Sequence, residues 1–210
     1  HRVEIEGVNL PSYEQKMYDQ TAILFSVHVK NVHEGVAFER FMGDELLALL
    51  PTSSNSYKVV LAVPNDRKKA FLEMDDSALL KHLQVCMGYM AGVFTVVGGR
   101  QTYPMVLSYT LEPNCPNRVL LMGHSSHILH PISGQGYNLS VQDIGALDVL
   151  MQSGMSDVNE VLRQYTVQRK SAWLKMVKVT DQMVEFFRKP KYRCLRPFSL
   201  GIMQRSSALQ

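Results

Sequence analysis

Apolar and polar positions alternate along the first part of the chain, which is the pattern of strands that pack one face against a core. The run TAILFSVHVK at 21–30 is rich in β-branched and aromatic residues, so it predicts a strand. Further strands are predicted at 37–42, 46–50 and 57–63. Pro51 and Pro64 are expected to end the last two of them. The short connections favour an antiparallel meander.

A helical spacing of apolar residues then predicts two helices, at 66–74 and 77–90. Asp75 and Asp76 suit a helix start, and Gly92 suits a stop. Later segments are predicted as strands at 93–97, 103–110 and 118–122, a loop after Gly123 that is neither strand-like nor helix-like, and helices at 141–151 and 157–187. Pro190 and Pro197 interrupt the segment after the last helix, and a short amphipathic piece is expected at the end. The sequence predicts an α+β fold with a mostly antiparallel sheet, covering helices and a helical C-terminal tail.

Composition narrows the class of protein. The chain has 210 residues, of which 46% are apolar, and a net charge of +3 with the signs interspersed. This charge pattern gives no basic stripe for nucleic acid, so no nucleic-acid partner is predicted. No apolar run approaches the length of a membrane span. The three cysteines lack paired or metal-knuckle spacing, which favours a reducing compartment. Because the chain opens with His1 and has no signal segment, it is expected to be a fragment.

The most informative segment is RVLLMGHSSHILHPISGQGYNLSVQD, at 118–143. A buried strand ends in glycine, a loop with Pro and Gly comes next, and a helix is expected to begin after Asn138. Gly134 and Gly136 let the backbone approach a ligand without hindrance from a Cβ, and a helix start attracts negative charge. An ordinary strand-to-helix loop with glycines at its turns explains the same spacing, so the pattern alone leaves both interpretations open.

The residues from Gly123 to Asp143 resemble the second flavin-binding motif of the class A flavin-dependent aromatic hydroxylases. That motif reads Gly-Asp, Ala-Ala-His, Pro, Gly-Gln-Gly, Asn, Asp. The match is closest to the ubiquinone-biosynthesis branch of the family. Other similar stretches occur in the same order as in that branch: HEGVAFERF at 33–41, LLALLP at 46–51, RQTYP at 100–104, and YTVQRK and TDQMVEFF within 163–187. The resemblance covers nearly all of the chain.

This resemblance implies an FAD cofactor, with NAD(P)H as reductant and O₂ as oxidant. Carried over residue by residue, it places Gly123 and His124 beside the ribityl and phosphate end and Pro131 beside the isoalloxazine ring. The residues implied at the pyrimidine edge are Gly134, Gln135, Gly136 and Asn138. His124 stands where the family has Asp or Asn. Tyr103 and Pro104 are implied in a loop near the substrate ring, with a structural turn as the equal alternative. No catalytic side chain is implied, because the cofactor carries the chemistry.

The resemblance also implies a domain plan: a substrate-binding sheet domain at 1–117, a flavin-binding strand, loop and helix at 118–155, and C-terminal helices at 156–210. The family's N-terminal nucleotide-binding unit, with its GxGxxG loop, is absent from this sequence. Residues 1–18 look like the segment that comes after the family's Asp-Gly motif. The chain is therefore expected to be the C-terminal part of a longer hydroxylase. The full-length protein is expected to hydroxylate a polyprenylated phenol in ubiquinone synthesis.

Three histidines at equal intervals, His124, His127 and His130, suggest a transition-metal site as an alternative. No carboxylate or cysteine stands among them, and Pro131 bends the chain directly after them. No metal is therefore predicted, and packing, backbone hydrogen bonds and flavin contact are favoured.

The partners implied beyond the substrate and O₂ are other ubiquinone-biosynthesis proteins and a membrane surface. The basic cluster of Arg188, Lys189, Lys191, Arg193 and Arg196 suits an anionic membrane, but a solvated helix end is the favoured explanation, because basic residues are favoured near helix C-termini anyway. The expected location is the cytoplasm or the inner-membrane periphery of a bacterium, or the mitochondrial matrix side. A rival of another class is a flavin-free fragment that binds quinone precursors or a partner protein.

Overall fold

The structure is a computed structural model that describes residues 8–189 and residue 192. The described residues form two compact units. Unit 1 contains 8–18 and 106–184, and unit 2 contains 19–105 together with 185–189 and 192. The fold is α+β with a mostly antiparallel sheet, as the sequence predicts. The division into 1–117, 118–155 and 156–210 stays a prediction about domain organisation.

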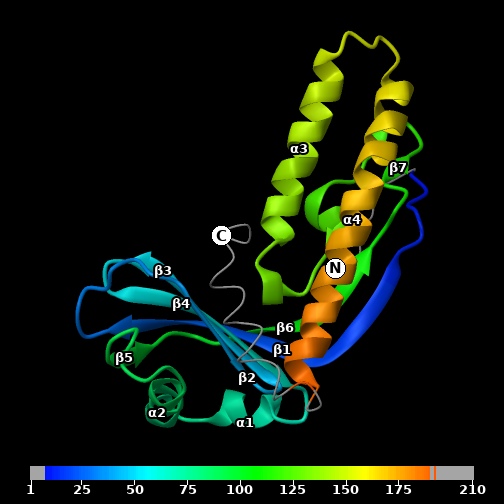
Figure 1. The fold of residues 1–210 in the computed structure, drawn as a ribbon. Coiled ribbons are helices and arrows are strands. Elements are labelled where there is room, and N and C mark those ends of the chain that lie inside the picture. Colours follow the sequence, from blue (N-terminus) through cyan, green and yellow to red (C-terminus); the bar gives the residue numbers. More distant parts are fainter. Residues whose placement is uncertain (1–7, 190–191, 193–210) are drawn as a thin grey trace. The chain divides into compact units, whose positions relative to one another are not determined.

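Unit 2 is built on an antiparallel meander (Figure 1). Its strands are neighbours in the sheet in the order β2 (Phe38–Met42), β3 (Glu45–Ser53), β4 (Ser56–Pro64) and β1 (Glu14–Val29), and β5 (Phe94–Val97) pairs with the end of β1. Every second side chain of β1 from Ile23 to Val29 is buried, which is the period of two that the sequence shows. These side chains form one core with β3, β4 and the helices.

Two helices of unit 2 contribute to that core: α1 (Lys68–Glu73) and α2 (Asp76–Met87). Asp75 is the N-cap of α2, because its side chain accepts a hydrogen bond from the Ala78 amide at 2.9 Å. The prediction that Gly92 stops this helix is wrong. The helix stops at Gly88. This residue has a φ of 61°, and a right-handed helix cannot continue through a residue with a positive φ.

Pro51 does not end its strand, contrary to the prediction, and β3 continues to Ser53. The neighbouring strand β2 pairs with β3 only as far as Leu49. Pro51 therefore lies beyond that pairing, where the missing N–H interrupts no ladder on that side. Pro64 is the last residue of β4, in agreement with its predicted role as a stop.

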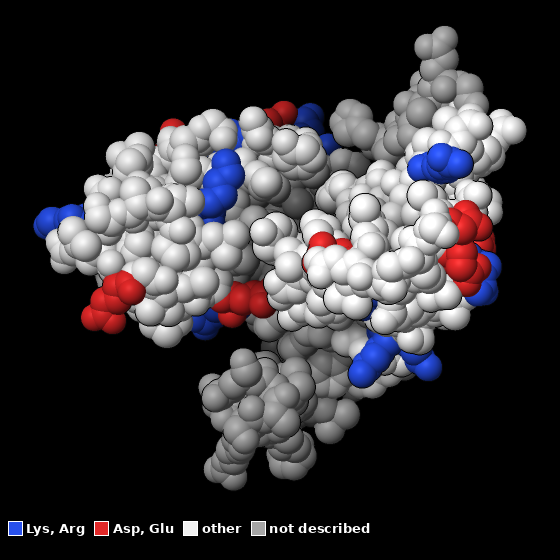
Figure 2. Space-filling view, turned by 90° about the horizontal axis from the view of Figure 1, so that it is seen from above, with Lys and Arg blue, Asp and Glu red and all other residues white. Residues whose placement is uncertain are grey.

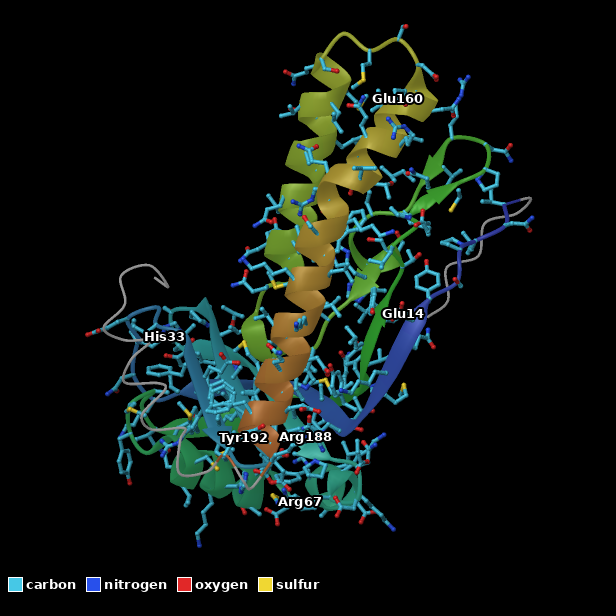
Figure 3. All side chains as sticks on the ribbon, turned by 45° about the vertical axis from the view of Figure 1, so that its right-hand side comes forward. Glu14, His33, Arg67, Glu160, Arg188 and Tyr192 are labelled. Carbon is cyan, nitrogen blue, oxygen red and sulfur yellow. The ribbon has the colours of Figure 1, made fainter. Side chains whose placement is uncertain are left out.

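Unit 1 contains a short hairpin, a turn-rich segment and two long helices. The hairpin pairs β7 (Asn114–Cys115) with β8 (Val119–Leu120), and the last part of β6 (Gln101–Tyr109) pairs with β9 (His127–Ile128). The helices are α3 (Gly136–Gln152) and α4 (Val158–Arg188), which lie side by side as a hairpin in Figures 1 and 3. Leu139, Tyr165 and Trp173 are the buried residues of a hydrophobic core in this unit.

The segment after Gly123 differs from the predicted loop. It contains two 3-10 turns, η1 (Gly123–Ser125) and η2 (Pro131–Ser133), on either side of β9. Helix α3 begins at Gly136 rather than after Asn138. Its first three residues carry no buried apolar side chain, so hydrophobic spacing could not mark the true start.

The predictions for the region of Pro197 and for the terminal amphipathic piece lie outside the described residues, as do Lys191, Arg193 and Arg196 of the basic cluster. On the face shown in Figure 2, acidic and basic side chains occur in small groups separated by uncharged areas. None of the described helices is both long enough and apolar enough to cross a membrane.

Candidate functional site

The predicted flavin loop begins with a tight glycine turn. Gly123 has a φ of 57°, a conformation that side chains with a Cβ rarely adopt. A Cβ on Gly123 would stand 3.3 Å from Oγ of Ser140, which belongs to α3. Ser140 is held in turn by the hydrogen bond that its Oγ donates to the Gly136 carbonyl at 3.1 Å. The turn therefore lies directly against the first two turns of α3, and glycine is required there on two grounds.

Hydrogen bonds fix the residues after this turn. Oγ of Ser125 accepts from the Met122 amide at 3.0 Å and also lies 2.7 Å from the Met122 carbonyl. Tyr13, which precedes β1, donates its hydroxyl to the Ser125 carbonyl at 2.6 Å. These contacts fix the conformation of η1, which follows strand β8 in the sequence.

The start of α3 is open. No side chain caps its first turn at Gln135, and a Cβ on Gly136 would meet no atom within 4 Å. The first amides of an α-helix have no partner inside the helix, so this start presents N–H groups and the positive end of the helix dipole. Asn138 donates its side-chain amide to Oε1 of Gln135 at 3.1 Å, so this contact involves no backbone amide of the first turn. Such an end suits a negatively charged or electron-rich group.

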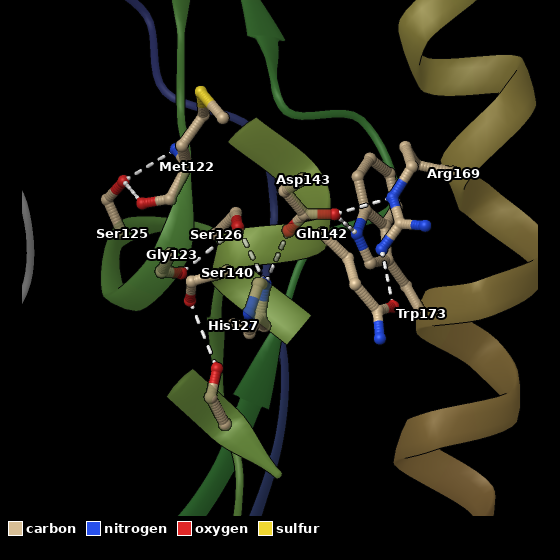
Figure 4. Close-up of polar contacts among 11 residues, drawn as sticks. Met122, Gly123, Ser125, Ser126, His127, Ser140, Gln142, Asp143, Arg169 and Trp173 are labelled. Atoms are coloured by element: carbon tan, nitrogen blue, oxygen red, sulfur yellow. Dashed lines mark hydrogen bonds and ion pairs between the residues drawn. The ribbon is translucent and has the colours of Figure 1, made fainter. Parts of the chain in front are cut away.

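Behind this open end, a buried cluster of polar side chains joins α3 to α4 (Figure 4). Asp143 is fully buried, and its Oδ1 accepts hydrogen bonds from Nε of Arg169 at 2.7 Å and Nε1 of Trp173 at 2.9 Å. Arg169 and Trp173 are four residues apart on α4, so they share one face of the helix. Oδ1 of this buried carboxylate therefore has one cationic donor and one neutral donor, which satisfies it.

His127 lies on the other side of Asp143. Its Nδ1 is 3.9 Å from Oδ2 of Asp143 and 2.8 Å from Oγ of Ser126. Burial lowers the pKa of His127 below its ordinary value, while the negative charge of Asp143 acts in the opposite direction. The imidazole is therefore held in its neutral form. Neither Nε2 of His127 nor Oδ2 of Asp143 has a hydrogen-bond partner in the described part of the chain.

The residues predicted to contact the cofactor all lie in unit 1, along η1, η2 and the first turn of α3. His124 and Pro131 are exposed, as are Gly134 and Asn138. Gly134 ends η2 with a φ of 61°. The roles assigned to these residues remain proposals.

Tyr103 and Pro104 lie elsewhere, in unit 2. They are not in a loop, as the resemblance implies, but within strand β6. Both are exposed, and the Tyr103 side chain is 50% exposed. Residues that favour strands stand on both sides of Pro104, Thr102 and Tyr103 before it and Val106 after it. A strand tolerates proline where its N–H is not needed.

The three histidines have different surroundings. His124 is exposed, whereas His127 and His130 are buried. Nδ1 of His130 accepts a hydrogen bond from the Ile132 amide at 3.1 Å and so caps η2, and its ring contacts Tyr18 edge-on. Among the residues that the structure describes, no three ligand-type side chains are grouped to hold a metal ion.

Four residues of the buried cluster had no predicted role in the sequence: Ser126, Asp143, Arg169 and Trp173. The sequence marks Asp143 only as the last position of the motif, and Trp173 only as a residue of a predicted helix. The signal that would have connected them is the spacing of Arg169 and Trp173 by one helical turn, combined with an acidic residue in the apolar pattern of the preceding helix.

The chain matches the FAD binding domain family over residues 6–180, so it belongs to that family. Among curated relatives, it is 27% identical to ubiquinone hydroxylase UbiL of Rhodospirillum rubrum over 175 residues, which cover 81% of this chain and 41% of UbiL. It is 25% identical to the 3-demethoxyubiquinol 3-hydroxylase of Escherichia coli over 218 residues, which cover 99% of this chain and 54% of the relative. The chain thus spans about half the length, or less, of these relatives.

A solved structure with the same fold is Klebsiella pneumoniae HpxO in complex with FAD and uric acid, with a TM-score of 0.66 and 14% sequence identity. The similarity covers 92% of this chain and 51% of HpxO. The anhydrotetracycline hydroxylase OxyS of Streptomyces rimosus is also similar, with a TM-score of 0.61 and 19% identity over 94% of this chain and 39% of OxyS. At these identities the likeness concerns the fold.

The residues of unit 1 fit an FAD cofactor. No side chain caps the start of α3, which leaves the amides of its first turn without a side-chain acceptor, and a Cβ on Gly136 would meet no atom within 4 Å. An electron-rich heterocycle or a phosphate requires such donors, and a helix start supplies them without a charged side chain.

Proposed function

We propose that this chain forms the substrate-binding sheet and the isoalloxazine-side part of an FAD-dependent monooxygenase that hydroxylates the ring of a polyprenylated phenol in ubiquinone biosynthesis. The observation that carries the proposal is the uncapped start of α3 at Gly136, adjacent to the glycine turn at Gly123, in a chain of the FAD binding domain family. The curated relatives named ubiquinone hydroxylase support the substrate class.

FAD, when bound, would accept reducing equivalents from NAD(P)H and activate O₂. The protein's part would be to bind and orient the cofactor. Gly123 and His124 would hold the ribityl and phosphate end, and Pro131 would lie beside the ring. The backbone at Gly134, Gln135, Gly136 and Asn138 would face the pyrimidine edge, where the positive end of the α3 dipole stabilises negative charge.

Tyr103 and Pro104 are proposed to contact the substrate from strand β6, since both are exposed there. Other ubiquinone-biosynthesis proteins and the membrane periphery are proposed as the protein's surroundings, in the bacterial cytoplasm or at the mitochondrial matrix side. The three domain boundaries, 1–117, 118–155 and 156–210, belong to the same proposal.

The direct test is to purify the full-length protein and record its absorbance spectrum. We expect a bound flavin, reduction of that flavin by NADH or NADPH, and a hydroxylated product from a short-chain polyprenylphenol with uptake of O₂. Full-length protein without flavin absorbance, and with no binding of added FAD, would instead favour the noncatalytic role.

A second test uses the 210-residue chain alone. We expect it to bind FAD weakly, because a two-part ligand that loses one anchoring site also loses the effective concentration that links the two. Titration of the chain with FAD, followed by flavin fluorescence, measures this affinity. A submicromolar dissociation constant would contradict the assignment of the remaining FAD contacts to another segment.

A further inference from the structure

Ser126 connects the buried polar cluster to the backbone of the Gly123 turn. Its Oγ lies 3.1 Å from the Gly123 carbonyl and 2.8 Å from Nδ1 of His127. A hydroxyl has one hydrogen to donate, and a carbonyl can only accept. Ser126 therefore donates to Gly123, and the contact with His127 requires an N–H at Nδ1 that donates to Ser126.

Asp143 favours the same arrangement. Its unpaired Oδ2 lies 3.9 Å from Nδ1 of His127, so its negative charge attracts the hydrogen on that nitrogen. Its other oxygen is fixed by Arg169 and Trp173. Asp143 thus orients the imidazole, the imidazole orients the Ser126 hydroxyl, and the hydroxyl holds the Gly123 carbonyl.

This chain of contacts ends at the two segments proposed to bind the cofactor. The amide of Ser126 also donates to the Gly123 carbonyl, at 3.0 Å, so both hydrogen-bond donors of Ser126 contact this carbonyl. The Gly123 turn itself packs against Ser140 of α3. Asp143 is on that same helix, one turn further along. A shift of α3 would therefore move Asp143 and the Ser140 side chain that packs against the Gly123 turn at the same time.

We propose that Asp143, His127 and Ser126 form a positioning relay that keeps the Gly123 turn in register with the first turn of α3, so that both segments contact one flavin. This inference rests on the proposed FAD-binding function. The three residues are positioning residues, because none of them touches the cofactor in the proposed arrangement and each acts through its neighbour.

The first test compares the variant Ser126→Ala of the full-length protein with the matched control Ser153→Ala. Both serines donate Oγ to the carbonyl three residues earlier, Ser126 to Gly123 and Ser153 to Leu150 at 2.6 Å, but Ser153 lies at the far end of α3. We expect Ser126→Ala to raise the FAD dissociation constant about tenfold, the usual effect of one lost buried hydrogen bond. Ser153→Ala should bind FAD as the wild type does. Equal affinity of both variants would overturn the relay.

The second test is a double-mutant cycle with Asp143→Asn. If the relay acts as one unit, Asp143→Asn and Ser126→Ala together will weaken FAD binding no more than the stronger single change does. Additive effects would mean that the two residues act independently, which contradicts the proposal. If Asp143→Asn does not fold, His127→Phe takes its place in the cycle.

A readout without flavin separates this inference from the proposed function. Hydrogen exchange of the apoprotein, followed by mass spectrometry, should show faster exchange at 123–128 in Ser126→Ala than in the wild type, and no change in that segment in Ser153→Ala. If the wild type fails to bind FAD but the local exchange appears, the proposed function fails and the structural relay stands. Unchanged exchange at 123–128 would overturn the relay whatever the flavin result.

Discussion

Asp143 of α3 accepts a hydrogen bond from Nε of Arg169 of α4 at 2.7 Å, with Asp143 fully buried and the Arg169 side chain 12% exposed. Removing one partner of a buried ion pair leaves the other charge without compensation, which costs about 3–5 kcal/mol. We expect Arg169→Met to lower the free energy of unfolding by about that amount. Urea denaturation of the variant and the wild type measures the difference.

The control for this prediction is Arg163→Met on the same helix. Arg163 is exposed and pairs with Glu160, which Figure 3 labels near the start of α4. The loss of Arg163 should therefore change stability little. The double variant Asp143→Leu with Arg169→Met should be more stable than Arg169→Met alone, because it removes the orphaned charge. An Arg169→Met protein as stable as Arg163→Met would show that the buried pair is not an ion pair in solution.

The neutral, buried His127 makes stability depend on pH. Its pKa is lowered from 6.5 by burial. The unfolded chain therefore binds a proton at a higher pH than the folded chain, and stability falls as the pH drops below about 6.5 toward the folded pKa. We expect unfolding midpoints in urea to decrease between about pH 7.5 and pH 5.5, before most carboxylates titrate.

His127→Asn should flatten this dependence. The amide nitrogen of asparagine can take the place of Nδ1 and donate to Ser126, but it does not titrate. The variant and the wild type are compared at the same series of pH values. A slope that is the same in both proteins would assign the pH dependence to other groups.

Much of the fold could be predicted from the hydrophobic pattern, because most elements bury one face. The period of two in β1 and the helical period of α2 both correspond to buried residues. The failures have local causes. Pro51 is tolerated because the pairing of β2 with β3 ends before it. The end of α2 is set by Gly88, which has a positive φ, and spacing alone does not distinguish it from Gly92.

The candidate site was recognised from a motif rather than from periodicity, because its residues are turns and an exposed helix start. The buried relay could not be predicted in this way. Ser126 and His127 are adjacent in sequence, but Asp143 and Arg169 come from two helices, and only packing brings these residues together. A single sequence shows which residue types are present, but it does not show which of these side chains contact one another.

Gly123 and Gly134 allow backbone strain to be separated from packing. Both have φ near 60°, but a Cβ would meet Ser140 at 3.3 Å only at Gly123, and nothing within 4 Å at Gly134. We expect Gly134→Ala to cost about 1 kcal/mol for the left-handed conformation alone. Gly123→Ala should cost more, because Ser140 is held by its own hydrogen bond and cannot move freely. Thermal unfolding of both variants tests this, and equal losses would contradict it.

Gly136→Val should remove flavin binding without unfolding the protein. Gly136 needs no positive φ, and a Cβ there meets no atom of the chain. A branched side chain would instead fill the space at the helix start that the flavin edge is proposed to occupy. Gly145→Val is the matched control, since Gly145 is equally open but lies in the middle of α3. FAD titration of both full-length variants measures the effect, and normal flavin content in Gly136→Val would show that the loop is not the flavin site.

His124 is the position where the motif departs from its family, and it is exposed in η1. If it contacts the ribityl chain, His124→Asn in the full-length protein should bind FAD as tightly as the wild type or more tightly, because an amide offers the same hydrogen bonds without a titrating ring. His124→Leu should weaken binding by about 1–3 kcal/mol, the cost of leaving a polar partner without its hydrogen bond.

The competing expectation is a metal bound by His124, His127 and His130. Asn at position 124 would then be as damaging as Leu, and substitution of His127 or His130 would release a stoichiometric metal. Among the described residues no three ligand-type side chains are grouped to hold a metal ion, and His124 is exposed whereas His127 and His130 are buried. Flavin titration of the two His124 variants, together with metal analysis of the wild type after dialysis against chelator, distinguishes the two. A transition metal that remains in stoichiometric amount would end the assignment of His124 to the flavin.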